Sequence, residues 1–391
     1  MEQGNSHLNR RQLAMGAAMG ASSLLFTPAG LAAQGPGEGR SFIDARQFGA
    51  AGDGKTNDTA ALQRALDAIG HTSGALFLPP GIYLTGELRV PADVAMIGLP
   101  GWNYSGPGGS VLQLADTNAT CVLNLTDARG ATIQGLALDG LHLGAGIHGI
   151  ATKRANWGPH EDGFRIEGCQ IVRFSGDGVH LECAWCFSVR HCMMGYNAGD
   201  GLSLRGWDGF LIDNWFSGNK RAGYAARQEN ASVTFTANRI EWNGEENMVV
   251  TGGDGYQITG NFFDRAGTVG IALRKGRVPC TQVTITGNFI KRSGKLSDAA
   301  SHDSAQILLE ECEGVTCIGN SLQAGRDDGG SGVWSPAYGI IHRSLRNCVI
   351  KDNVLHDGAI KQLMLDLGAG TEGVAIADNP GRLFTDFARK W

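Results

Sequence analysis

The sequence predicts an all-β fold, a single-stranded right-handed parallel β-helix (a solenoid) with a short N-terminal capping helix. Two observations lead to this prediction: a repeat of near 23 residues runs through much of the chain, and 59 of the 391 residues are glycine. That glycine content is about twice the usual share of roughly 7%, and it implies many tight turns. Only 11 residues are proline, which is unlike a collagen or a disordered linker.

The repeat has an apolar residue at its first position, asparagine or cysteine at its fourth, and a second apolar residue at its sixth. Examples are ITGNFF, ITGNFI and IKDNVL. Each unit also holds a second segment in which apolar and polar residues alternate, such as GDGVHL or TVGIAL. Short alternating runs separated by Gly, Asn and Asp are typical of strands and turns. A unit this small cannot bury its own apolar face, so it must stack on its neighbours. The fourth position falls at Cys169, Cys192, Asn214, Asn238, Asn261, Asn288, Asn320, Asn353 and Asn379.

Stacking gives the repeated asparagines a structural role. The same position of successive coils lines up along the axis at about 4.8 Å per coil. We therefore expect an internal ladder in which the side-chain amides hydrogen-bond from coil to coil. Cys169 and Cys192 stand in the same column, where a small buried thiol can substitute.

The start of the chain reads as an export signal. Residues 1–33 contain Arg10 and Arg11, a short apolar run, and small residues near a plausible cleavage site. This layout is typical of a twin-arginine-type signal peptide, which predicts a periplasmic or secreted protein with no membrane span after cleavage. The β-helix domain is then residues 34–391, with an N-terminal cap over about 41–100 and coils over about 110–380. Within the cap, Asp58 or Thr59 can cap a helix running roughly to Ala68.

The stretches DARQFGAAGDGKTNDTAALQRALDAIG and GALFLPPGIYLTGELRVPADVAMIGLPG resemble the entry to pectate-lyase-superfamily β-helix proteins, including tailspike-like and polygalacturonase-related members. With the signal and the repeat, the chain is also similar to exported β-helix repeat proteins of unassigned activity. The resemblance implies a fold more than an activity. The polygalacturonase signatures are missing, His148 in GIHG reads as a coil residue, and GPHED has Gly158 where the Asp-Pro-His of mannuronan epimerases has its aspartate.

Two carboxylates give the best candidate for chemistry. Glu241 and Asp264 follow the asparagine of adjoining repeats at the same offset, so stacking places them about 5 Å apart on one wall. Repulsion would raise the pKa of one of them, and an acid beside an ionised carboxylate suits glycoside hydrolysis. The alternative is a charge ladder in which Glu241, Asp264 and Lys291 offset one another.

Basic and aromatic residues near this pair are the candidate substrate-binding groups. Guanidinium and ammonium groups grip acidic sugars, and aromatic rings stack on sugar rings or serve packing. The candidates are Arg265, Lys291, Arg292, Arg274 and Trp242, with Arg205, Arg227, Trp207 and Trp215 as further members of the set. Insertions at residues 153–163, 294–305 and 325–339 are expected to wall a binding groove.

No cofactor or resident metal is predicted. The run HLECAWCFSVRHC gathers His180, Cys183, Cys186, His191 and Cys192, a weak zinc pattern because no second ligand pair follows at standard spacing. Asp327 and Asp328 are possible calcium ligands without a spaced carboxylate set to support them. The nine cysteines do not resemble a stapled scaffold, and most are expected to be buried or free.

These features predict an exported carbohydrate-active protein, foremost a glycoside hydrolase that cleaves a polysaccharide with Glu241 and Asp264. One alternative is a lyase on a uronate-containing glycan, with Lys291 or Arg292 as the base. Another is a non-catalytic glycan-binding or envelope repeat protein. The net charge of −5 argues against nucleic acid as a partner, and the resemblance implies a possible homotrimer.

Overall fold

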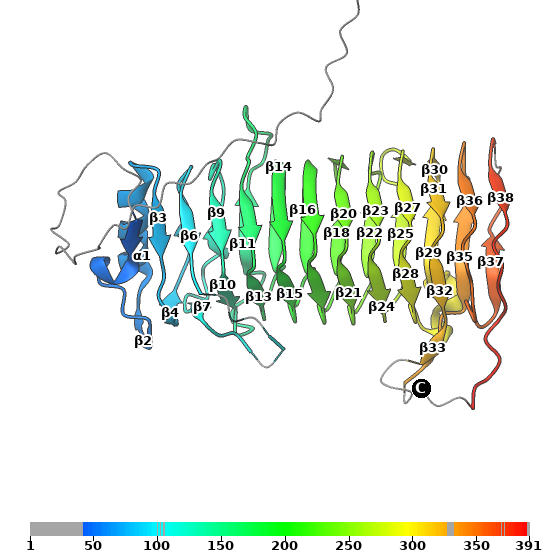
Figure 1. Ribbon diagram of the computed structural model, residues 1–391, viewed down its shortest axis with the longest axis horizontal. Helices are drawn as coiled ribbons and strands as arrows, with labels where there is room; N and C mark the ends of the chain where they lie inside the picture. Colours follow the sequence, from blue (N-terminus) through cyan, green and yellow to red (C-terminus); the bar gives the residue numbers. More distant parts are fainter. Residues whose placement is uncertain are drawn as a thin grey trace, which may run out of the picture. The chain divides into compact units, whose positions relative to one another are not determined.

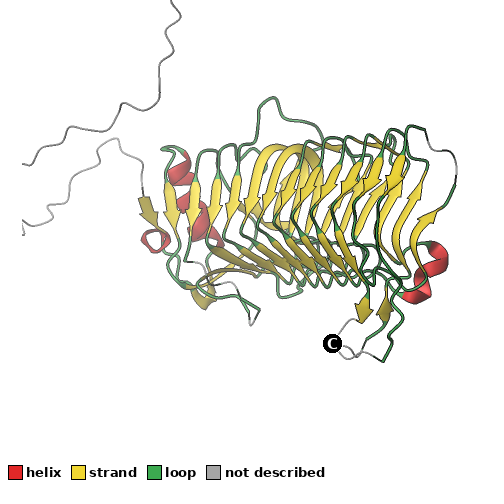
Figure 2. Ribbon diagram, turned by 45° about the vertical axis from the view of Figure 1, so that its right-hand side comes forward, coloured by secondary structure: helices red, strands yellow, loops and turns green. Residues whose placement is uncertain are grey.

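The computed structural model describes residues 42–388 except 100, 102, 105, 327–331, 369 and 371. In this part of the chain successive coils stack from the β2 end to the β38 end as parallel strands (Figures 1 and 2). Every strand pair in the stack is parallel, apart from one small hairpin. The predicted β-helix is therefore confirmed, whereas the predicted signal peptide at 1–33 lies outside the described residues.

Three faces run along the stack, and we number them I to III. Face I is the 11-stranded sheet. Its outward positions carry the predicted carboxylates. Its strands are β2 (Asp53–Asn57), β4 (Gly81–Thr85), β7 (Ser110–Leu114), β10 (Leu136–Asp139), β13 (Gln170–Val172), β15 (Met193–Gly195), β17 (Trp215–Ser217), β21 (Arg239–Glu241), β24 (Phe262–Asp264), β28 (Phe289–Lys291) and β32 (Ser321–Gln323).

Face II follows face I within each coil, after a turn. Long strands β14 and β16 bend from face II into face III, so both faces share one sheet. The strands of face II are β5 (Leu88–Arg89), β8 (Cys121–Asn124), β11 (His148–Lys153), the first part of β14 (Val179–Arg190) and of β16 (Leu202–Ile212), β18 (Tyr224–Ala226), β22 (Met248–Thr251), β25 (Ile271–Arg274), β29 (Ala305–Glu310), β35 (Tyr338–Arg343) and β37 (Gln362–Asp366).

Face III closes the coil and leads into the next strand of face I. It holds the second parts of β14 and β16 together with β1 (Phe42–Asp44), β3 (Ala75–Phe77), β6 (Ala95–Ile97), β9 (Thr132–Gln134), β12 (Arg165–Glu167), β20 (Thr234–Thr236), β23 (Gln257–Thr259), β27 (Thr284–Thr286), β31 (Thr316–Ile318), β36 (Val349–Lys351) and β38 (Ala375–Ala377). Short strands β19 (Asn230–Ala231), β26 (Cys280–Thr281) and β30 (Cys312–Glu313) lie between faces II and III, and β33 (Gly325–Arg326) pairs with β34 (Trp334–Ser335).

The asparagine ladder lies where face III meets face I. Asn238 Nδ2 donates to Asn261 Oδ1 at 3.1 Å, and Asn261 Nδ2 donates to Asn288 Oδ1 at 3.0 Å. The pattern continues through Asn320, Asn353 and Asn379, and the Cys192 amide joins it by donating to Asn214 Oδ1. The predicted ladder is confirmed, and each bond contributes about 1 kcal/mol net.

A second ladder lies at the turn between faces I and II, and the sequence analysis did not find it. Asn197 Nδ2 donates to Asn219 Oδ1 at 3.0 Å, and Asn219 Nδ2 donates to Asn243 Oδ1 at 2.9 Å. All three residues are buried. Both edges of face I are thus held by buried amides, which keeps its strands in register.

Helix α1 (Thr59–Gly70) lies at the first coils, as predicted for a cap. Its buried residues Leu62, Ala65, Leu66 and Ile69 recur at helical spacing and pack toward β3 and β5. Asp58 is the N-cap residue, as predicted, but its carboxylate accepts from the backbone amides of Ala51 and Gly52 and not from the helix. Two 3₁₀ helices, Ala45–Phe48 and Leu296–Ser301, complete the elements.

All nine cysteines are free thiols, and eight of them are buried. This confirms the prediction that most are buried or free. Among the described residues, no helix has both the length and the apolar character needed to cross a membrane.

Candidate functional site

Face I places the predicted pair as the repeat required. Glu241 and Asp264 are register partners on the neighbouring strands β21 and β24, and both alternate outward with the buried Ile240 and Phe263. Their side chains are nevertheless covered, because Glu241 is only 5% exposed and Asp264 only 1%. Substrate therefore has little access to either carboxylate.

Glu241 is held by three donors. Trp215 Nε1 donates to Oε1 at 2.9 Å, Arg239 Nε donates to Oε2 at 2.9 Å, and the Tyr104 hydroxyl lies 3.3 Å from Oε1. Tyr104 comes from the segment between β6 and β7, which crosses several coils to reach this strand. The carboxylate is thus committed to neighbours within the fold.

Asp264 lies between two guanidinium groups. Arg292 Nε donates to Oδ1 at 2.8 Å, and Oδ2 accepts from both Arg292 and Arg265. Burial raises the pKa of the Asp264 carboxyl, while the bonds from Arg292 and the charges of Arg265 and Lys291 oppose that shift. Glu241 and Asp264 are each balanced by cations of their own, so mutual repulsion is not the dominant interaction of this pair.

The binding set predicted around this pair is divided between two faces. Lys291 and Arg292 follow Asp264 on the next coil of face I, and the Arg265 guanidinium lies 4.1 Å from the centre of the Trp242 ring. Arg274 instead ends β25 on face II, where it pairs with Glu246, Asp303 and Glu310. Arg274 comes at the end of the second strand of its coil, as expected, and it lies away from Asp264 because the chain turns a corner between positions 265 and 274.

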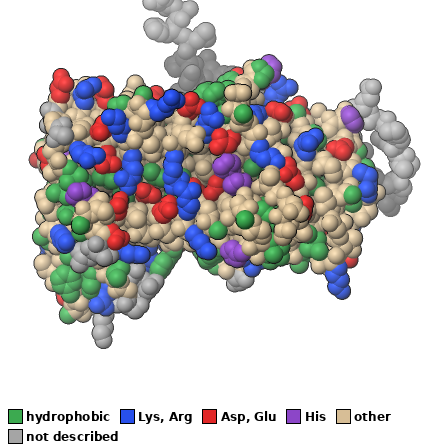
Figure 3. Space-filling model, turned by 180° about the vertical axis from the view of Figure 1, so that it is seen from behind, with side chains coloured by type: hydrophobic (Ala, Val, Ile, Leu, Met, Phe, Trp, Pro, Cys, Tyr) green, Lys and Arg blue, Asp and Glu red, His purple; other side chains and the backbone are tan. Residues whose placement is uncertain are grey.

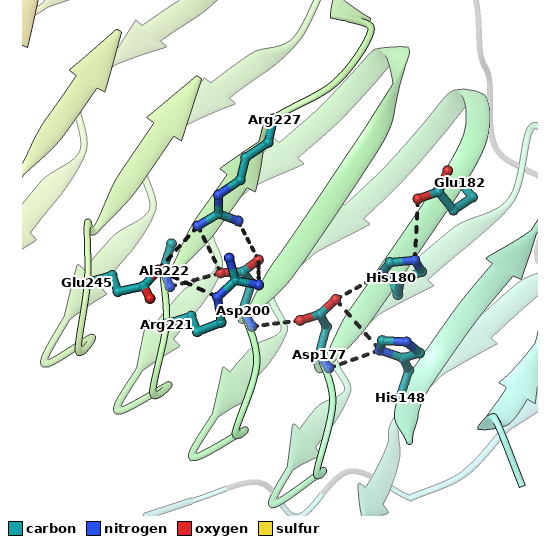
Figure 4. A network of polar contacts seen from close by, with 9 residues as sticks. All are labelled: His148, Asp177, His180, Glu182, Asp200, Arg221, Ala222, Arg227 and Glu245. Atoms are coloured by element: carbon teal, nitrogen blue, oxygen red, sulfur yellow. Dashed lines mark hydrogen bonds and ion pairs between the residues drawn. The ribbon is translucent and has the colours of Figure 1, made fainter. Parts of the chain in front are cut away.

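Face II contains a polar network that begins at the turn entering the face. Asp177 and Asp200 occupy the same position of Gly-Asp-Gly turns in successive coils. A Cβ on Gly178 would lie 2.7 Å from the Gly201 carbonyl oxygen, so close coil packing requires glycine there. The Asp200 amide donates to Asp177 Oδ1 at 2.7 Å, which links the two turns (Figure 4).

Two histidines share the carboxylate of Asp177 (Figure 4). His180 Nδ1 lies 2.7 Å from Asp177 Oδ2, and His148 Nδ1 accepts the Asp177 amide at 2.9 Å. The rings of His148 and His180 stack with centroids 4.2 Å apart. These bonds give His180 a proton on Nδ1 when it is neutral, and its Nε2 then faces Glu182 Oε1 at 3.5 Å (Figure 4). Neutral His148 has the opposite tautomer, with its proton on Nε2.

The two histidines have opposite pKa shifts. Burial and the neighbouring His180 lower the pKa of His148 to about 4. Burial also lowers the pKa of His180, but the hydrogen bond and charge of Asp177 outweigh it and raise the pKa above its ordinary value. Burial raises the pKa of Asp177, yet the His180 bond and the histidine charges hold it below its usual range. The cluster therefore combines a ring whose pKa is lowered, a carboxylate whose pKa is lowered and a ring whose pKa is raised.

Arginines continue the network along the face. Asp200 is buried, its Oδ1 accepts the Ala222 amide at 2.9 Å, and its Oδ2 lies 2.6 Å from Arg227 Nη1. Arg221 approaches the same carboxylate at 3.7 Å, and both arginines also approach Glu245 (Figure 4). The guanidinium groups of Arg221 and Arg227 remain partly exposed.

A pocket of about 500 Å³ adjoins this network. Beneath the charged side chains of face II lies a second apolar cluster that includes Ala225, Val249 and Ala272, separate from the main core. The space-filling view shows acidic, basic and histidine side chains close together on one face of the molecule (Figure 3). Face II carries this mixture of side chains. The pocket is lined by Arg227, Glu245, Glu246, Val249, Thr251, Thr268, Arg274 and Asp303.

Two of the predicted insertions flank face II. Asp303, from the insertion at 294–305, bonds to Arg274 at 3.1 Å. Trp157, from the insertion at 153–163, stacks on Trp207 with ring centroids 3.6 Å apart and approaches Arg205. Of the third insertion, residues 327–331 lie outside the described residues, and with them the possible calcium ligands Asp327 and Asp328.

Among the described residues, one group of side chains has a metal-binding arrangement: His148, Asp177 and His180, with ligand atoms within 4.8 Å of one another. Both Nδ1 atoms are already hydrogen-bonded to Asp177, so the cluster suits proton transfer better than coordination. The weak zinc pattern is not supported in the part of the chain described here, because Cys183, Cys186, His191 and Cys192 do not form such a group.

Sequence reasoning missed the network because its members are scattered. From the sequence alone, His148 is predicted to be a coil residue and His180 part of a zinc pattern. The available signal was the repeated Gly-Asp-Gly at 176–178 and 199–201, one coil apart, each followed by a strand of face II.

The fold and this surface define the class of protein: a right-handed parallel β-helix with a charged, histidine-containing face. The family described as "Right handed beta helix region" matches residues 124–290 and 228–385. The chain belongs to this family. A second family, "Rhamnogalacturonase A/epimerase, pectate lyase-like", matches residues 42–105, in agreement with the predicted superfamily entry.

Individual relatives are distant. A capsule K30/K69-specific depolymerase of Klebsiella phage K5-2 is 25% identical over 316 residues, which is 76% of this chain and 38% of the relative. Another from Klebsiella phage K64-1 is 26% identical over 51% of this chain and 30% of the relative. The chain thus spans about a third of the length of these relatives.

Solved structures agree on the fold. The A-module of the mannuronan C-5 epimerase AlgE6 of Azotobacter vinelandii has a TM-score of 0.68 at 18% identity, covering 85% of this chain and 99% of that one. DFA-IIIase of Arthrobacter chlorophenolicus A6 has a TM-score of 0.67 at 15% identity, covering 88% of this chain and 100% of that one.

Proposed function

We propose that this chain is a carbohydrate-active enzyme that acts on an acidic polysaccharide bound at face II. The observation that carries the proposal is the Asp177–His180 pair, which is linked through Asp200 to partly exposed arginines and a pocket. The names of the similar depolymerases and the epimerase support a polysaccharide as the substrate. Export and a homotrimer stay predictions.

The proposed reaction begins with proton abstraction. His180 Nε2 takes the proton from the sugar carbon that bears the carboxylate, while Asp177 holds the ring in the required tautomer. A carboxylate of the sugar is bound by the guanidinium groups of Arg221 and Arg227, which disperses its developing negative charge. His148 offers its Nε2–H as a neutral hydrogen-bond donor. The C–O bond on the next carbon then breaks as a C=C bond forms, and the proton held on His180 Nε2 passes to the departing oxygen, which leaves an unsaturated sugar.

The test is an activity screen of the full chain and His180→Ala against acidic polysaccharides (alginate, polygalacturonate, hyaluronan) and neutral ones (dextran, xylan). We expect ultraviolet-absorbing unsaturated ends from an acidic polysaccharide with the parent chain, and a large loss with the variant. Absence of unsaturated product, or its undiminished release by His180→Ala, contradicts the proposal.

A glycoside hydrolase is the second candidate, favoured by the register of Glu241 and Asp264. It requires the covering residues Tyr104, Arg265 and Arg292 to move when substrate binds, since both carboxylates are buried. In the same screen it gives reducing ends without unsaturated product, and Glu241→Gln abolishes their release.

A further inference from the structure

The turn that leaves face I has one backbone conformation in coil after coil. Arg173, Tyr196, Trp242, Arg265 and Arg292 have φ between 51° and 60°. This left-handed region is inexpensive for glycine and asparagine and unusual for bulky residues. Stacking requires this backbone conformation but does not require these particular side chains. The presence of bulky residues at these positions therefore needs a separate explanation.

Two of these positions carry large aromatic residues that stay in solvent. Tyr196 is 43% exposed and Trp242 is 42% exposed. Gly218 occupies the same turn in the coil between them, and a Cβ there would lie 2.9 Å from the Tyr196 ring. The Tyr196 ring therefore lies over Gly218. The two rings start two coils apart, about 9.6 Å along the axis.

Two further rings extend the surface toward face I. Tyr104 is 46% exposed and meets Trp215 edge-on, with centroids 4.9 Å apart. Arg239 lies over the Trp215 ring at 5.4 Å, and Arg265 lies over Trp242 at 4.1 Å. We call Tyr104, Tyr196, Trp215 and Trp242 the aromatic stripe.

The surroundings of the stripe favour an anionic ligand. On the outward positions of β10 to β28 and the turns after them, Arg173, Arg239, Arg265, Lys291 and Arg292 outnumber Asp139, Glu241 and Asp264. These carboxylates are buried, at 1% to 5% exposed. Arg265 and Arg292 pair with Asp264 and are mostly covered, whereas the side chains of Arg173 and Arg239 are 38% and 43% exposed. The accessible charged groups beside the rings therefore include these two arginines.

We propose that the aromatic stripe is a second glycan-binding site, on a different face from the proposed reaction centre. Flat rings at coil spacing suit the apolar C–H faces of successive sugar rings, and the arginines suit carboxylate substituents. A linear polysaccharide fits because the stripe follows the axis of a regular stack. The site goes beyond the proposed function and does not depend on it, since no stripe residue belongs to the face II network.

The experiment uses full-length His180→Ala, so that turnover cannot remove the ligand. Its migration is measured in native gels containing alginate, polygalacturonate, hyaluronan or dextran. We expect an acidic polysaccharide to retard His180→Ala. Adding Tyr196→Ala and Trp242→Ala to this background should weaken the binding about tenfold. Trp242→Phe should retain most of the binding. Circular dichroism establishes that each variant is folded.

Phe210→Ala is the matched control, because Phe210 is 53% exposed on the face III part of β16, and its loss should change nothing. Unchanged binding by the double variant overturns the site, as does a parent protein that none of the acidic polysaccharides retards. Failure of the enzyme proposal leaves this result intact, since the assay needs no turnover.

Discussion

Faces I and II both place carboxylates on adjoining coils, and they use them differently. On face I, Glu241 and Asp264 are saturated by arginine, tryptophan and tyrosine donors. On face II, Asp177 is bound to His180, whose second ring nitrogen lies 3.5 Å from Glu182 on a partly exposed side chain. Vertical stacking therefore brings like groups together on both faces, but the partners of each carboxylate decide whether it can react.

The largest effect is expected on face II. His180→Ala removes the proposed base, and general acid–base catalysis is worth about 10²- to 10⁴-fold in rate. The measurement is turnover of whichever acidic polysaccharide the parent chain degrades. His191→Ala is the control, because His191 also pairs with an aspartate, Asp213, but on the exposed corner after β14. Equal losses in both variants would mean that the place of His180 on face II gives it no special role in turnover.

On face I the expected effect is on stability. Asp264→Asn leaves Arg265 and Arg292 without their buried counter-charge, which costs about 3–5 kcal/mol. Urea unfolding measures this, with Asp213→Asn as the exposed control at about 0–1 kcal/mol. Turnover below the unfolding transition should be retained. A stable Asp264→Asn protein that has lost turnover would instead favour the hydrolase.

The pH dependence of stability separates the two histidines. The pKa of His148 is lowered to about 4, so the unfolded chain takes up a proton near pH 6.5 that the folded chain refuses. Stability should therefore fall by about 3 kcal/mol between pH 6.5 and 4. The raised pKa of His180 acts at higher pH: its contribution is complete below the unfolded pKa and is lost as pH rises through the folded one.

The measurement is urea unfolding at several pH values between 4 and 8 for the parent and His148→Gln. The variant should lose most of the dependence between about pH 6.5 and 4, because glutamine does not titrate. If the free energy of unfolding of His148→Gln depends on pH as strongly as that of the parent, other groups cause the dependence. Turnover should fall on the acid side as His180 becomes protonated.

The smallest effect is expected for Glu241→Gln. Glutamine keeps the shape and can still accept from Trp215, so the loss is about 1–2 kcal/mol of charge-assisted bonding to Arg239. Turnover should stay within about twofold of the parent, because Glu241 is outside the proposed reaction centre. Loss of a general acid or base would instead lower the rate by about 10²- to 10⁴-fold. Loss of turnover in a folded Glu241→Gln protein would indicate that Glu241 takes part in the reaction.

The repeat was sufficient to predict the coils, the ladder from Asn214 to Asn379 and the register of Glu241 with Asp264. These features depend on local periodicity, which a sequence displays directly. Asp58 takes the predicted N-cap position without a side-chain bond to the helix, because its carboxylate accepts from the backbone amides at positions 51 and 52. The ladder of Asn197, Asn219 and Asn243 was missed because its spacing was masked by differing neighbours.

What the sequence determined by itself was the stack: a period near 23 residues, alternating strands, and the amide column that joins one coil to the next. What only the tertiary structure decided was which side chains meet across a corner. Arg274 lies beside Glu246 on face II, and His148 lies beside Asp177. The direction of each turn determines the face on which a residue lies. Burial and charge neutralisation are likewise properties of neighbours from several coils, and so no single repeat could specify them.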